Sequence, residues 1–508
     1  MENKLIYNVE DTPKMSKLIV FAFQQVLAVL AATILVPVLI GLPTNIPSAI
    51  LGAGLGTIVY LLFTKFKSPV VISSSFAFLT ALGNAIAFGY MGIALGALFA
   101  GLVYVIIAII VKYVGTNWVK KLLPPVIIGP VVAIIGLSLA GNAAGQIVQA
   151  NGDMFNGGYN LIGLLCGLVT FFTVVICSVQ GRFKTARLIP FIIGIGAGYL
   201  LASIFTAIGY ATNAEYLQVV DYSPLVDNFS PVTVESFLSI PKLSLVEGIK
   251  ELVTGEVSPE ILAANPYAQP LTWIGVAEVA LAFVPVAFVV FAEHIADHTN
   301  LGTIINKDLL NEEPGLERTL LGDGVGSIVG TFLGVCPNTT YGESVGCVAI
   351  TKNASVKTIF AAALMLVGLA FLSPITAFLR TIPNAVMGGV CFTLYGFIAV
   401  SGLKMFKEVD LSVSKNLFTV SAILIAGIGG LSIQIPYALK EVIDPLTGTS
   451  GNEVEKFITI TSVATALFLG IATYAVCNFV EKRFGGKDGE EAAPEVAEQP
   501  AENAEENK

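Results

Sequence analysis

The sequence predicts an all-α integral membrane protein with fourteen transmembrane segments, arranged as two inverted repeats of seven. Hydrophobic residues make up 55% of the 508 positions, charged residues make up only 12%, and the mean hydropathy is +0.81. These values lie outside the range of soluble domains and are typical of proteins with many membrane-spanning helices. A regular alternation of positive charge between successive connections supports the same prediction.

Fourteen apolar segments follow one another along the chain. They lie near 18–40, 46–64, 69–83, 89–111, 123–142, 159–179, 187–209, 271–300, 319–335, 337–351, 356–378, 384–403, 416–437 and 457–480. When alternate connections are grouped, one set holds 22 of the 27 Lys and Arg residues and the other holds 5. Because Lys and Arg accumulate on the cytoplasmic side, we expect an even number of spans and two cytoplasmic termini. This is the pattern of a multi-pass protein of the cytoplasmic (inner) membrane.

The net charge of −9 does not indicate a nucleic-acid partner. The acidic excess comes from the connection at 210–270 and from a tail at 484–508 that is rich in Ala, Pro and Glu. A tail of this composition is expected to be disordered. The bilayer and a small solute are therefore the expected partners.

Two of the fourteen segments are too short and too polar to be ordinary spans. Residues 69–83 (PVVISSSFAFLTALG) and 337–351 (PNTTYGESVGCVAIT) each begin with proline and are rich in small polar residues. They are the third and tenth segments, which correspond to each other in an inverted repeat of seven. A matched pair of short, interrupted segments is the best sequence indication of a transporter binding site, since unwound backbone at membrane depth has to line a cavity.

The segment near 271–300 ends in a dense ionisable cluster that contains both histidines of the chain, Glu293, His294, Asp297 and His298. One charge at the bilayer centre costs roughly 2.5–3.5 kcal/mol, so such groups indicate a site that handles protons, ions or polar solutes. Glu293 and Asp297 share one helical face, and His294 and His298 share another. The alternative without a functional role is that His298 lies near water.

Three other carboxylates lie in apolar segments. Glu343 is the ionisable residue of the second short segment, and we expect it to accept a hydrogen bond from a ligand N–H, or else to be satisfied by nearby backbone. Glu278 and Asp323 are expected near helix ends, without a special role. His294 and His298 also have metal-ligand spacing, but no third ligand is visible and no metal or other cofactor is expected.

Several motifs resemble one transporter family when they are taken together and in order. They are TILVPVL at 33–39, SSFAF at 74–78, AEH at 292–294, PNTTYGE at 337–343, PNAVMGG at 383–389 and LYG at 394–396. From about Leu18 to Gly402 the chain resembles the nucleobase–ascorbate transporters, and within that family the bacterial uracil permeases.

The resemblance implies a core domain and a gate domain, with short β-like strands in segments 3 and 10. The core domain would comprise segments 1–4 (18–115) and 8–11 (271–378). The gate domain would comprise segments 5–7 (116–209) and 12–14 (379–483). Residues 1–17 would form a cytoplasmic N-terminus and 210–270 an extracytoplasmic connection. A homodimer through the gate domain is also implied.

The resemblance further implies that a nucleobase lies between the two short strands. The residues that would bind it are Glu293, Glu343, Ser75, Phe76, Gly342 and Tyr395. Proton coupling would involve Glu293, Asp297, His294 and His298, because the family couples uptake to a proton. Asp297 departs from the histidine that uracil permeases often have one turn after the first glutamate.

These features predict a proton-coupled uracil importer that works by alternating access and is not an enzyme. Glutamate at 343 favours uracil, since an ionised carboxylate can only accept hydrogen bonds and uracil offers N–H groups. A xanthine or other purine carrier on the same fold is the main alternative. An intramembrane metalloenzyme that uses His294 and His298 is a further alternative, and a passive channel is another.

Overall fold

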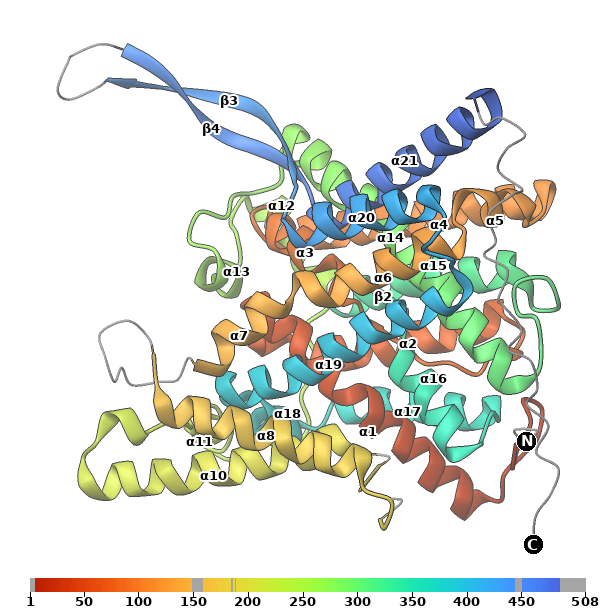
Figure 1. The fold of residues 1–508 in the computed structure, drawn as a ribbon. Coiled ribbons are helices and arrows are strands. Elements are labelled where there is room, and N and C mark those ends of the chain that lie inside the picture. Colours follow the sequence, from red (N-terminus) through yellow and green to blue (C-terminus); the bar gives the residue numbers. More distant parts are fainter. Residues whose placement is uncertain (1–4, 149–158, 184–185, 188, 444–449, 485–508) are drawn as a thin grey trace, which may run out of the picture.

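The computed structural model describes residues 5–148, 159–183, 186–187, 189–443 and 450–484, and it consists mostly of helices (Figure 1). Nearly all of the acidic tail expected at 484–508 lies outside the described residues. Within the described part of the chain, nine helical stretches are long and apolar enough to cross a membrane. They comprise α1 (Met15–Leu39), α2 (Ile46–Phe63), α4 (Gly89–Val114), α6 (Pro125–Ser138) continued by α7 (Ala140–Val148), α8 (Leu161–Val179), α10 (Pro190–Thr212), α14 (Trp273–Ile305), α19 (Asn384–Lys404) and α21 (Ser462–Phe484).

The other five expected segments are helices that are shorter or more polar. They are α3 (Leu79–Ile86), α15 (Gly315–Leu333), α16 (Gly342–Thr351), α17 (Val356–Ala370) and α20 (Ser414–Ile428). The number of spans therefore stays a prediction. One expected boundary is wrong: α20 ends at Ile428, whereas the apolar segment was expected to run to 437, and a strand begins at Ile433.

The long helices pack in two groups. In the first group α1, α2, α4, α14, α15 and α17 lie against one another, and in the second α6, α8, α10, α19, α20 and α21 do. The groups meet where α14 lies against α6 and α21, and where α1 lies against α10 and α19. The boundary between the groups thus runs along α14, the helix that carries the ionisable cluster.

Glycines allow α15 to approach α2 closely. Gly326 and Gly330 on α15 face Gly56 and Gly52 on α2. A Cβ atom added at Gly52 would lie 2.2 Å from the carbonyl oxygen of Gly330, and one added at Gly56 would lie 2.8 Å from that of Gly326. Small residues at helix crossings permit this close backbone packing in membranes. The result is that α15, despite its polar residues, is held inside the first group.

Two three-residue strands interrupt the helical pattern inside the first group. β1 (Ile72–Ser74) and β2 (Asn338–Thr340) pair antiparallel, with Ser73 opposite Thr339. A 3₁₀ turn, η2 (Phe76–Phe78), follows β1 and leads into α3, while α16 follows β2 directly. Each strand is therefore followed by the N-terminus of a short helix.

A long hairpin projects from the helical body between α20 and α21 (Figure 1). Its strands are β3 (Ile433–Ile443) and β4 (Ser450–Ile460), paired antiparallel from Ile433 opposite Ile460 to Ile443 opposite Ser450. The sequence analysis does not predict a hairpin, because it assigns 433–437 to the apolar segment near 416–437 and 457–460 to the one near 457–480.

The 210–270 connection folds into short helices that reach from the second group to the first. Val220 N–H donates to Thr206 Oγ1 on α10 (3.0 Å), and Ser244 Oγ donates to the carbonyl oxygen of Gly334, just after α15. The elements of this connection are η3 (Glu215–Leu217), α11 (Ser223–Asn228), α12 (Ser244–Thr254) and α13 (Pro259–Ala264). The remaining short helices are η1 (Pro43–Asn45), α5 (Asn117–Leu122), α18 (Ser373–Arg380) and η4 (Met405–Glu408).

Candidate functional site

The candidate site lies where the two short strands meet the middle of α14. The antiparallel pairing continues past β1, since Ser75 N–H donates to the carbonyl oxygen of Pro337 (2.8 Å). The hydroxyl of Tyr341 donates to the carbonyl oxygen of Ser74 and ties the end of β2 to β1. α14 lies against β2, η2 and α16. Both η2 and α16, whose first N–H groups have no partner within their helices, therefore lie against the same helix.

Two carboxylates from distant parts of the chain come together in this region. Glu343 is the second residue of α16, and Glu293 lies in the middle of α14. Both side chains are half-buried, and they are close enough to interact electrostatically. Among the described residues, the Glu293 carboxylate makes no hydrogen bond to another group of the protein. The Glu293 carboxylate is therefore half-buried and has acceptor oxygens available to a solute.

Asp297, one turn after Glu293, faces the same strands. Its Oδ2 accepts a hydrogen bond from Thr340 Oγ1 (2.8 Å), and its Oδ1 lies near Gly342, 3.8 Å from where a Cβ of that residue would be. The side chain is only 8% exposed. Asp297 therefore contacts the junction between β2 and α16.

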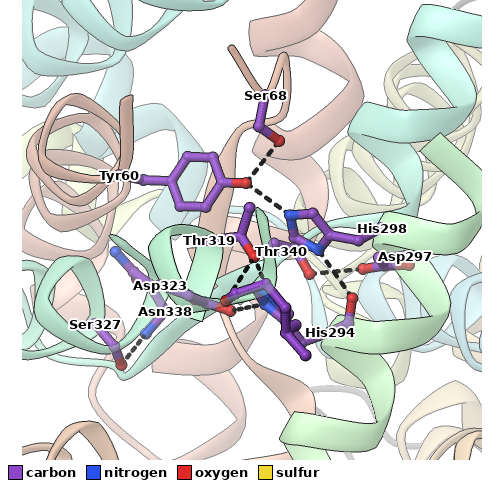
Figure 2. Close-up of polar contacts among 11 residues, drawn as sticks. Tyr60, Ser68, His294, Asp297, His298, Thr319, Asp323, Ser327, Asn338 and Thr340 are labelled. Atoms are coloured by element: carbon purple, nitrogen blue, oxygen red, sulfur yellow. Dashed lines mark hydrogen bonds and ion pairs between the residues drawn. The ribbon is translucent and has the colours of Figure 1, made fainter. Parts of the chain in front are cut away.

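The two histidines face away from the strands, toward α2 and α15 (Figure 2). His294 is hydrogen-bonded through Nδ1 to Asp323 Oδ2 (2.7 Å) and through Nε2 to Thr319 Oγ1 (3.0 Å). The Nδ1 atom of His298 donates to the carbonyl oxygen of His294 (2.8 Å), and its Nε2 is hydrogen-bonded to the Tyr60 hydroxyl (2.7 Å). The two imidazole rings are stacked, with centroids 4.0 Å apart.

The chain of polar contacts continues beyond the histidines. Figure 2 shows the Tyr60 hydroxyl between His298 and Ser68, whose Oγ lies 2.7 Å from it. Tyr60, Ser68 and Asp323 are all fully buried. The structure thus divides the four ionisable residues into two pairs: Glu293 and Asp297 on the strand side, His294 and His298 in a network behind them.

The expectation for Asp323 is wrong. It lies in the middle of α15, not near an end, and its carboxylate is bonded to His294 in the interior. Sequence reasoning also missed Tyr60 on α2, Ser68 in the loop before β1 and Thr319 on α15, which carry no distinctive sequence signal. Only Asp323 offered a signal, because a carboxylate between two glycines in an otherwise apolar stretch is costly unless it is paired.

Phe76 and Tyr395 close the site at the boundary between the helix groups. Phe76 belongs to η2 and Tyr395 to α19, and their rings meet edge to face with centroids 5.4 Å apart. Beside them, Ser75 is buried and its Oγ has no hydrogen-bond partner among the described residues. Since buried polar atoms are almost always paired, Ser75 Oγ is a second group available to a solute or water.

In the described part of the chain, no group of three or more His, Cys, Asp and Glu side chains is placed to hold one metal ion. All four ring nitrogens of His294 and His298 are hydrogen-bonded within the protein instead.

Residues 16–435 match the sequence profile described as "Permease family", of the Xan_ur_permease type. The chain belongs to this family. This permease is 38% identical over 436 residues to the uracil permease of Bacillus caldolyticus, covering 85% of this chain and 90% of that protein. It is 32% identical over 431 residues to the uracil permease of Escherichia coli (strain K12), with 84% and 88% covered. The resemblance to the nucleobase–ascorbate transporters is confirmed, and the permease is a multi-pass membrane transporter.

Solved structures extend the likeness to the fold. The permease aligns with SLC26A9 at a TM-score of 0.55 and 12% identity, covering 92% of this chain and 66% of that one. It aligns with the murine Slc26a9 anion transporter in the inward-facing state at a TM-score of 0.56 and 10% identity, covering 94% and 70%. At these identities the likeness is one of fold alone.

Proposed function

We propose that this permease imports uracil together with a proton by alternating access. The observation that carries the proposal is the Glu293 carboxylate, which is half-buried beside Glu343 and the two strands and has no hydrogen bond within the protein. The relatives named above as uracil permeases support the choice of substrate. No observation favours the purine alternative.

Recognition of the base would use both the carboxylates and the backbone. Glu293 and Glu343 can only accept hydrogen bonds when ionised, and they match the N–H groups of uracil. The backbone N–H groups of Phe76 and Gly342, at the starts of η2 and α16, match its carbonyl oxygens. Ser75 Oγ lies beside Phe76 and is free to add a further contact, and Tyr395 closes the site from α19.

Proton coupling would follow from the closeness of three carboxylates. Glu293 interacts electrostatically with both Asp297 and Glu343. Like charges repel strongly where water is scarce, so a proton on Glu293 or Asp297 removes repulsion and favours loading. His294 and His298 would exchange protons with Asp323 behind this site. One proton moving down about 100 mV supplies roughly 2.3 kcal/mol, or about fiftyfold accumulation.

Alternating access would move the first helix group, as the core domain, against the second group, as the gate domain. This assignment gives segments 1–4 and 8–11 to the core and the remaining segments to the gate, with fourteen spans in two inverted repeats. The distribution of Lys and Arg supports cytoplasmic termini in the inner membrane. The apolar outer faces of α8 and α10 suit either lipid or a second copy of the chain.

The proposal is tested by two isosteric substitutions measured in proteoliposomes and on purified protein. Glu293→Gln should abolish uphill uptake of labelled uracil driven by an imposed pH gradient. Glu343→Gln should weaken uracil binding about tenfold to a hundredfold, since hydrogen bonds to charged groups contribute about 1.5–3 kcal/mol. Glu278→Gln, on the same helix as Glu293 but fifteen positions earlier, is the matched control and should behave like the wild type.

Three outcomes would contradict the proposal. The first is wild-type accumulation by the Glu293→Gln variant. The second is unchanged uracil affinity in the Glu343→Gln variant. The third is uptake by the unmodified protein that never exceeds equilibration in an imposed pH gradient and is unchanged by a protonophore, because this would indicate a passive channel.

A further inference from the structure

A cavity lies at the boundary between the two helix groups, beside Phe76. It has a volume of 260 Å³. η2 and α3 form its wall on the first group. The end of α6 and the residues that join the hairpin to α20 and α21 form its wall on the second group. The lining residues are Phe76, Ala77, Thr80, Ile135, Ser138, Leu139, Gly430, Ser432, Thr459, Thr461, Ser462 and Val463.

The lining chemistry suits a neutral, flat, polar ring. Six of the twelve lining residues carry a hydroxyl group and none carries a charge. A hydroxyl group both donates and accepts hydrogen bonds, so this set can serve carbonyl and N–H groups alike. Ile135, Leu139 and Val463 supply apolar faces against which a ring can pack. An ion would find no counter-charge in this lining.

The cavity is large enough for a base. Its volume is roughly nine times the ~30 Å³ that one water molecule occupies in the liquid. A six-membered ring with two carbonyl groups therefore fits with room for a few waters, which can bridge it to the hydroxyl groups.

Phe76 separates this cavity from the site at the strands. Its side chain is 6% exposed, it forms part of the cavity lining, and its ring also lies against Tyr395. Because Phe76 lines the cavity and directly follows Ser75 after β1, the cavity adjoins the site at the strands. The walls belong to different helix groups, so relative movement of the groups would open or close this passage.

We infer that this cavity is an outer loading site, in which a nucleobase is held by hydroxyl groups before it passes Phe76 to the two carboxylates. This inference rests on the proposed function and adds a second binding site to it. The loading site selects neutral rings by its lack of charge, whereas the inner site selects N–H groups by its carboxylates. The orientation proposed from the distribution of Lys and Arg would place the cavity toward the extracytoplasmic side.

The test is protection of introduced cysteines by uracil. Thr80→Cys and Ser138→Cys place thiols at two exposed positions of the lining, one on each wall. A membrane-impermeant maleimide is added from the extracytoplasmic side, with and without uracil. Thr212→Cys, at the exposed end of α10 and outside the cavity lining, is the matched control. The unsubstituted protein gives the background, because five of its six cysteines are buried and Cys477 is half-buried.

Each cavity cysteine is measured alone and together with Glu343→Gln, which weakens the inner site. If the loading site has a Kd on the order of 1 mM, roughly 10 mM uracil should slow labelling about tenfold in both backgrounds. Labelling at Thr212→Cys should not change. Size-exclusion profiles show that each variant is folded.

Two results would overturn the inference. If uracil slows labelling only when the inner site is intact, the protection comes from a conformational change and not from occupancy. If uracil slows labelling in neither background while the wild type still accumulates uracil, the cavity holds no base and the proposed function survives. Absence of uracil uptake by the wild type would instead refute the proposed function.

Discussion

Replacement of Glu251 in the 210–270 connection should destabilise the fold. Glu251 lies on α12, in the 210–270 connection, and is 4% exposed. Its Oε2 accepts a hydrogen bond from Tyr90 N–H (2.7 Å) in the first turn of α4, and its Oε1 accepts one from Ser258 N–H (3.0 Å). The approach is so close that a Cβ atom added at Gly89 would lie 2.2 Å from Oε2. The carboxylate thus caps α4 and fastens the connection to the first helix group.

The size of the effect follows from these two bonds. A hydrogen bond to a charged group contributes about 1.5–3 kcal/mol, and an anion at a helix N-terminus adds about 0.3–1 kcal/mol. Glu251→Ala removes both bonds and leaves two N–H groups unpaired. We therefore expect the free energy of unfolding to fall by about 3–5 kcal/mol. Glu251→Gln keeps one good acceptor and should cost about 1.5–3 kcal/mol.

The assay is thermal inactivation of the purified permease, followed by the monodisperse fraction after size-exclusion chromatography. Because membrane proteins often unfold irreversibly, the midpoint must be compared at one heating rate. We expect a decrease of roughly 5–10 °C for Glu251→Ala. Glu256→Ala, an exposed acid on the same connection, is the control. Equal midpoints for the two variants would refute the capping role of Glu251.

Three further outcomes are expected. Tyr60→Phe removes the hydroxyl bonded to His298 and should lower the free energy of unfolding by about 1–3 kcal/mol. An unchanged thermal midpoint would contradict a stabilising role of the buried network. Gly52→Val should prevent folding or strongly reduce expression, because its side chain would meet the carbonyl oxygen of Gly330, and normal expression would show that α2 and α15 can separate. Hydrogen bonds from Lys67 and Lys65 lower the pKa of the Glu313 carboxyl. The ion pairs of Glu313 with these lysines are therefore present above the ordinary pKa of glutamate and are lost as the pH falls through the lowered pKa. Glu313→Gln should nevertheless shift the midpoint at pH 7 by no more than about 1–2 °C, since exposed pairs contribute little.

Sequence patterns predicted the long helices well because length and hydropathy depend only on local composition. The segment expected near 159–179 corresponds to α8 (Leu161–Val179), and the one near 271–300 corresponds to α14 (Trp273–Ile305). The hairpin was missed because a count of apolar residues does not separate a period of two from a period of 3.6. Leu431, Ile433 and Ile435 alternate with polar or small residues, and this alternation is the signal of a strand.

The four-residue spacing of the cluster correctly predicted which side chains share a face. Glu293 and Asp297 both face the strands, and His294 and His298 both face the interior network. The residues that each face contacts cannot be predicted from this spacing, because they depend on how α2 and α15 pack. The close approach of these helices requires their glycines, and it carries Tyr60 and Asp323 to the two histidines.

A buried ionisable group needs a partner, and three partners of the cluster come from other segments of the chain. Asp323 is 29 residues from His294, Thr340 is 43 residues from Asp297, and Tyr60 is 238 residues from His298. A sequence therefore shows how many costly groups enter the membrane, but not which of them remains unsatisfied after folding. Once the described contacts are assigned, Glu293 is the member of the cluster without a hydrogen bond inside the protein. It is also the member that lies half-exposed beside Glu343. A solute with N–H groups would satisfy both carboxylates together, and this supports the proposal that the strands and the ionisable cluster form one site.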